Sequence, residues 1–83
     1  MELTKSQQEF LEILNTLNAT GVTPNVLQVA TATCNNLSRG QILYKHKVYK
    51  QLADRGLVGD LGSGQTHALR ITREGLRAIG EIR

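Results

Sequence analysis

The chain has 83 residues, a formal net charge of +3 and a hydrophobic content of 40%. This length allows one compact domain, residues 1–83, and not two. No apolar run approaches the roughly 20 residues of a membrane-spanning helix, and the N-terminus lacks the apolar region of a signal peptide. We therefore expect a cytoplasmic domain without a membrane partner.

The first predicted helix runs from about Lys5 to Asn18. Thr4 and Gln7 have the spacing of a capping box, and apolar residues then recur at helical intervals: Phe10, Ile13, Leu14 and Leu17. Glu9 and Glu12 lie on the outer face, which is therefore a poor candidate for contact with DNA.

The second predicted helix begins where Thr23 can cap and Pro24 suits the first turn. It should end near Thr33, because the threonines and asparagines that follow compete with the helix through local hydrogen bonds. Cys34 is the single cysteine and has no partner for a disulfide or a zinc site, so a buried, unreactive thiol is the favoured interpretation.

The third predicted helix, from about Arg39 to Arg55, lies between a second capping-box pattern, Ser38 and Gln41, and Gly56, which suits a helix end. At about 100° per residue, one side is apolar and carries Leu37, Ile42, Tyr44, Val48, Tyr49, Leu52 and Ala53. The opposite side is positive and carries Arg39, His46, Lys47 and Lys50. Tyr44 and Tyr49 are thus expected in the core.

A solvated surface is the ordinary explanation of a charged helix face. Here, however, the charge is concentrated: residues 1–34 carry −2, residues 35–59 carry +4 and residues 60–83 carry +1. Two helices with a short connection, the second of them basic, are typical of a helix-turn-helix that binds nucleic acid.

Two short alternating segments, residues 57–61 and 66–71, flank a glycine-rich stretch and predict a β-hairpin. Leu69 and Ile71 should face the core. A last short helix, capped by Thr72, is expected to reach about Ile82.

No pattern in the chain is typical of an enzyme. Gly62 and Gly64 precede neither a helix start nor the Lys-Ser or Lys-Thr pair of a phosphate-binding loop, so they predict a hairpin tip. His46 and His67 lie on different predicted elements, and the carboxylates are scattered. We expect no catalytic residues, no cofactor, no metal site and no small-molecule ligand.

Three stretches together resemble the winged helix-turn-helix family, in particular small regulators similar to the MarR and PadR groups. They are Leu3 to Leu14, Leu52 to Val58 (LADRGLV) and Leu69 to Gly75 (LRITREG). The resemblance implies an α+β winged helix: a three-helix helix-turn-helix core, a β-hairpin wing and a short C-terminal helix.

The same resemblance implies a protein that binds double-stranded DNA, as a small transcriptional regulator or an accessory factor of a mobile element. A recognition helix would enter the major groove with Arg39, Lys45, His46, Lys47 and Lys50. The wing would approach the backbone or minor groove with Ser63, Gln65, His67 and Arg70. The alternative is a protein-interaction module without direct DNA binding, and a homodimer is left open.

Two side chains of the third helix depart from its division into faces. Leu43 points to the polar side and Lys45 to the apolar side. Either the recognition helix starts later, with Leu37 to Leu43 forming a separate turn, or its N-terminal part is exposed for a partner.

Overall fold

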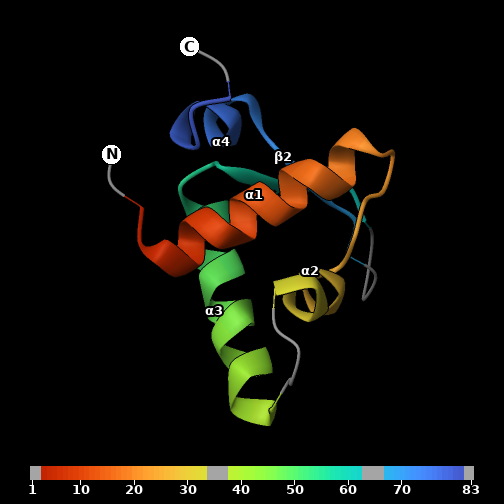
Figure 1. The fold of residues 1–83 in the computed structure, drawn as a ribbon, viewed down its shortest axis with the longest axis vertical. Helices are drawn as coiled ribbons and strands as arrows, with labels where there is room; N and C mark the ends of the chain where they lie inside the picture. The colour runs from red at the N-terminus through yellow and green to blue at the C-terminus, as the bar shows by residue number, and fades with distance from the viewer. Residues whose placement is uncertain (1–2, 34–37, 63–66, 82–83) are drawn as a thin grey trace.

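The computed structural model describes residues 3–33, 38–62 and 67–81. Over these residues the chain forms a small α+β fold of four helices and one two-stranded antiparallel sheet (Figure 1). In chain order the elements are α1 (Lys5–Ala19), α2 (Val26–Thr33), α3 (Arg39–Asp54), β1 (Val58–Asp60), β2 (Leu69–Ile71) and α4 (Arg73–Ala78). Helix, helix, basic helix, hairpin and short helix were all predicted in this order. Cys34, Leu37 and the hairpin tip, with Ser63 and Gln65, lie outside the described residues.

Side-chain caps start α1 and α3 where the sequence predicts. The Thr4 hydroxyl accepts a hydrogen bond from the Gln7 amide at 3.2 Å, and the Gln7 side chain accepts one from the Thr4 amide at 3.0 Å. Ser38 and Gln41 repeat both bonds at the same distances. Each box satisfies backbone donors that have no partner within the helix. With Ser38 as its cap, α3 is one continuous helix from Arg39, so the alternative in which Leu37 to Leu43 form a separate turn is wrong for the described residues.

The start of α2 differs from the prediction. Asn25, and not Thr23, is the cap: its Oδ1 accepts from the Gln28 amide at 2.8 Å, and Gln28 Oε1 accepts from the Asn25 amide at 2.8 Å. Pro24 is buried outside the helix, and its carbonyl oxygen accepts a hydrogen bond from the Leu69 amide at 2.8 Å. Pro24 therefore joins the sheet edge.

The C-terminal helix is shorter than predicted. Thr72 caps α4 as expected, because its hydroxyl accepts from the Gly75 amide at 3.1 Å, and it also donates to the Gly56 carbonyl at 2.7 Å. The helix ends at Ala78 and not at Ile82, since Gly80 turns the chain with a φ of 79°. Such a left-handed residue commonly ends a helix.

One apolar core joins all three main helices to the hairpin. Its fully or almost fully buried members are Phe10, Leu11, Leu14, Val26, Val29, Val48, Leu52, Leu57, Val58, Leu69 and Ile71. The inward face of β2, Leu69 and Ile71, was predicted correctly. Leu11 was not among the expected core residues of α1, whereas Ile13 and Leu17 of the expected stripe are only partly buried. Within the described ranges, no helix has the length and apolar character needed to cross a membrane.

The outer edge of β2 is satisfied by α1 and by the connection to α2. β2 pairs with β1 in the register Val58↔Ile71 and Asp60↔Leu69. On its other side, Asn18 Oδ1 accepts from the Ile71 amide at 2.7 Å, while Asn18 Nδ2 donates to the Leu69 carbonyl at 3.2 Å. Together with the Pro24 bond, these contacts satisfy backbone groups at the edge of β2. Moving the hairpin away from the helical core would break these bonds, and buried backbone groups without partners are costly.

Close packing of α4 requires a glycine at position 75. A Cβ atom there would lie 2.3 Å from the Leu57 carbonyl oxygen and 2.7 Å from Ile71 Cγ1. A backbone oxygen cannot move aside as a flexible side chain can, so we predict that Gly75→Ala lowers the free energy of unfolding by about 1–3 kcal/mol.

The matched control is Gly40→Ala in α3, where the nearest atom to the added Cβ is Ser38 Oγ at 3.9 Å. This change should leave stability unchanged or raise it by no more than about 1 kcal/mol. Urea unfolding followed by circular dichroism measures both variants, and equal stabilities would contradict the packing of α4 described above.

Candidate nucleic-acid interface

Only one side of α3 contacts the core. Lys45, Val48 and Leu52 are its buried residues, and they recur at intervals of three and four. The N-terminal end of α3 extends past α1 and α2 (Figure 1). Most of the helix surface, including the whole side opposite Val48, is therefore open to solvent.

Three side chains near residue 44 show how far this exposure reaches. Leu43 is 65% exposed and Tyr44 49%, whereas Lys45 is only 9% exposed. The expectation that Tyr44 packs in the core is wrong: its hydroxyl donates to Ser6 Oγ at 3.1 Å at the rim of α1. Lys45 takes the inward position, which removes it from the solvent-exposed candidates. The N-terminal part of α3 is thus exposed, as one of the two alternatives predicted.

The exposed basic face of α3 is defined here as Arg39, His46, Lys47 and Lys50, which are all solvent-exposed. At about 100° per residue these four positions fall within an arc of about 100°, with Lys47 at its edge, which places them on one side of the helix. Across the part of the chain that the structure describes, the side chains of Arg39, Lys47 and Lys50 take part in no hydrogen bond or ion pair. Asp54 lies on the same side at the C-terminal end, so the positive region ends near Lys50.

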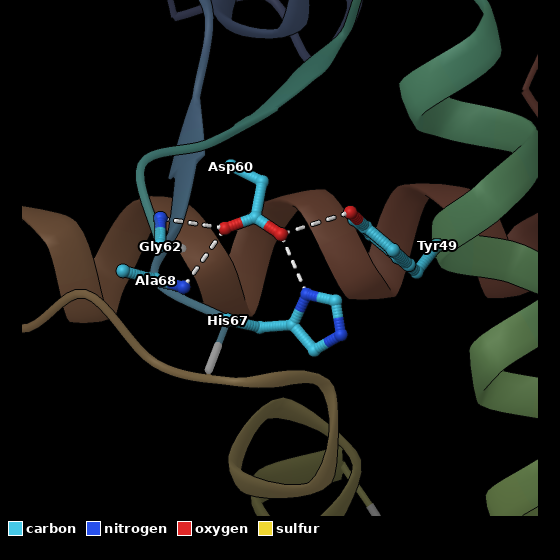
Figure 2. A network of polar contacts seen from close by, with 5 residues as sticks. All are labelled: Tyr49, Asp60, Gly62, His67 and Ala68. Carbon is cyan, nitrogen blue, oxygen red and sulfur yellow. Dashed lines mark hydrogen bonds and ion pairs between the residues drawn. The ribbon is translucent and has the colours of Figure 1, made fainter. Parts of the chain in front are cut away.

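A polar cluster joins the hairpin to α3 (Figure 2). Asp60 Oδ2 lies 2.5 Å from His67 Nδ1 and accepts a hydrogen bond from the Tyr49 hydroxyl at 3.4 Å. Asp60 Oδ1 accepts from the backbone amides of Gly62 at 2.9 Å and Ala68 at 3.0 Å. Because an ionised carboxylate can only accept, the His67 proton sits on Nδ1. The Tyr49 and His67 rings also meet edge to face, with centroids 5.9 Å apart.

The cluster changes the acidity of two of its members. The hydrogen bonds from His67, Ala68 and Gly62 stabilise the carboxylate and lower the pKa of Asp60 to about 2. Burial of the phenol, together with the negative charge of Asp60, raises the pKa of Tyr49. Asp60 is therefore ionised at neutral pH. Its carboxylate forms hydrogen bonds with Gly62 on one side of the hairpin, with His67 and Ala68 on the other, and with Tyr49 of α3.

Sequence reasoning placed His67 among the DNA contacts and missed its partner. A signal existed: Asp60 followed two residues later by Gly62 has the spacing of an Asx turn, in which the side chain accepts from the amide two residues on. The contact between Asp60 and Tyr49 had no comparable signal, because the two residues are far apart in the sequence. Asp60 shares a strand face with buried Val58, which directs it toward α3.

The structure separates the remaining candidate, Arg70, from this group. Arg70 is exposed on β2 and borders a shallow hollow that is also lined by Asn15 and Asn18 of α1 and by Thr23. Arg39, His46, Lys47 and Lys50 therefore form one surface, His67 lies beside Tyr49 of the same helix, and Arg70 belongs to a different region.

Comparison of the chain with models of known protein families, with curated proteins and with solved structures finds no significant match. Among the described residues, no group of three histidine, cysteine, aspartate or glutamate side chains is arranged to hold a metal ion.

The pKa of Asp60 predicts a specific dependence of stability on pH. A carboxylate whose pKa is about 2 when folded, against an ordinary 3.8, stabilises the folded state above about pH 4, and this contribution is lost as the pH falls from about 4 to about 2. Asp60→Asn lacks the titrating group, so the difference in urea midpoint between wild type and this variant should shrink over that range.

Asp54→Asn is the control, because it removes an exposed carboxylate at the end of α3 and leaves the cluster intact. It should follow the pH dependence of the wild type. A difference between Asp60→Asn and wild type that stays constant from pH 5 to about pH 2 would contradict the assigned hydrogen bonds.

Proposed function

We propose that this protein binds double-stranded DNA through the exposed basic face of α3, and that the four helices and hairpin constitute a winged helix-turn-helix domain. The single observation that carries the proposal is the set of exposed cations on one side of α3 without partners among the described residues. Lysine and arginine in this arrangement are suited to neutralise phosphates.

The geometry of α3 supports insertion into a groove. A helix with its side chains is about 10–12 Å across, which fits a major groove about 12 Å wide. Arg39 lies at the N-terminal end of α3, which extends past its neighbours (Figure 1), whereas His46, Lys47 and Lys50 lie at its middle and in its C-terminal half. In helix-turn-helix proteins the N-terminal residues of the recognition helix contact base edges, so this end of α3 would make the same approach.

The Asp60 cluster supports a second contact by the hairpin. It ties His67 and the loop to Tyr49, one residue before Lys50, and thereby fixes the hairpin beside the basic face. A hairpin held in this position would act as the wing and contact the DNA backbone. Its affinity would come from hydrogen bonds more than from charge, since the sequence of residues 61–66 carries no lysine or arginine.

Salt dependence of binding tests the proposal most simply. Each cation that contacts a phosphate releases about one counterion, so Lys47→Ala and Lys50→Ala should each reduce the slope of log K against log salt by about one unit. Fluorescence anisotropy with a labelled mixed-sequence duplex measures the slope. Circular dichroism should remain native, because both side chains are exposed.

Arg73→Ala is the matched control. It removes the same charge from an exposed position on α4, at the opposite end of the molecule from the N-terminus of α3 (Figure 1). Its slope should equal that of the wild type. If Lys47→Ala, Lys50→Ala and Arg73→Ala all keep the slope of the wild type, duplex binding by α3 is overturned and the protein-interaction module is favoured.

A further inference from the structure

Leu43 is an apolar side chain in the middle of the exposed basic face. It is 65% exposed, and it lies four residues after Arg39, three before His46 and four before Lys47. Residues at these intervals are immediate neighbours on a helix surface, with Cβ atoms about 5–6 Å apart. Lys50, seven residues on, lies on the same side, so cationic or polar side chains surround Leu43.

The composition of this surface limits what can cover it. A single exposed leucine is ordinary on a protein, but protein-binding sites usually present a contiguous apolar patch. The two adjacent apolar residues, Ile42 and Tyr44, are turned by about 100° to either side of Leu43. Ile42 is partly buried and Tyr44 is bonded to Ser6 of α1, so neither lies on the same face as Leu43. The partner that fits must accept cations around an apolar centre.

The major groove of DNA has this combination. Phosphates line its two walls, where the longer side chains of Arg39, Lys47 and Lys50 would reach them. On its floor, the C5-methyl group of thymine is the apolar group that proteins contact directly. Leu43 is shorter than its cationic neighbours and would point between the walls, toward the base edges.

We propose that Leu43 recognises thymine by packing against its C5-methyl group, so that the preferred binding sites contain a T·A pair beneath this position of α3. The proposal rests on duplex binding by α3 and adds to it a source of base specificity. Arg39, Lys47 and Lys50 would supply affinity for any sequence, and Leu43 would favour one base pair.

Replacement of thymine by deoxyuridine tests the contact, because it removes only the methyl group and keeps every hydrogen-bonding group of the base. The probe is the tightest-binding duplex selected by the wild-type protein from a randomised library, with each thymine replaced singly. At one thymine or more, the replacement should weaken binding by about fourfold, the expected effect of one buried methyl group.

The same scan with Leu43→Ala completes a double-mutant cycle. The penalty for deoxyuridine should disappear at that thymine, while the other thymines behave as before. Lys47→Ala is the control: it should weaken binding to every duplex and keep the deoxyuridine penalty. Leu43→Met, which retains an apolar side chain of similar volume, should retain most of the penalty.

Two results would overturn the proposal and leave duplex binding intact. One is a wild-type protein for which no single deoxyuridine matters, and the other is a penalty that persists in Leu43→Ala. In the second case Leu43 serves another contact, such as a protein partner. If the wild-type protein selects no duplex even at low salt, the proposed function fails together with this inference.

Discussion

Burial of Val48 and Leu52 determines the orientation of α3 and therefore the surface that solvent sees. Full burial of a leucine or valine side chain stabilises the folded state by about 1.5–3 kcal/mol relative to leaving it exposed. Val48 and Leu52 are both at most 2% exposed. Rotating the helix to hide a lysine of the basic face would expose these residues and desolvate a charge. The core thus holds Arg39, Lys47 and Lys50 outward, although none of them contacts it.

Two polar contacts give the hairpin a fixed place relative to this helix. Asn18 satisfies the outer edge of β2 from the side of α1, and Asp60 joins the hairpin loop to Tyr49 of α3. Gly75 lets α4 approach β2 closely enough to complete the packing. A fixed spacing between helix and hairpin lowers the ordering cost of binding one ligand with both, so these contacts matter for the proposed function as well as for stability.

Local signals predicted the elements, and tertiary contacts decided the exceptions. The capping boxes at Thr4 and Ser38 depend on residues three apart, so the sequence alone located the starts of α1 and α3. The helical wheel gave the direction of each side chain of α3 but not how far α1 and α2 cover it, which is why Tyr44 was expected in the core. The Tyr49 contact of Asp60 depends on the folded hairpin and could not have been predicted.

We propose that the basic face of α3 is the surface that binds DNA. The most direct test is to follow the backbone amide signals of the protein by NMR while a short mixed-sequence duplex is added at low salt. From this proposal we expect saturable shifts concentrated in α3 between Arg39 and Lys50, with smaller ones in the hairpin near His67. Shifts centred on the outer face of α1 or on α4, or no shifts at all, would contradict it.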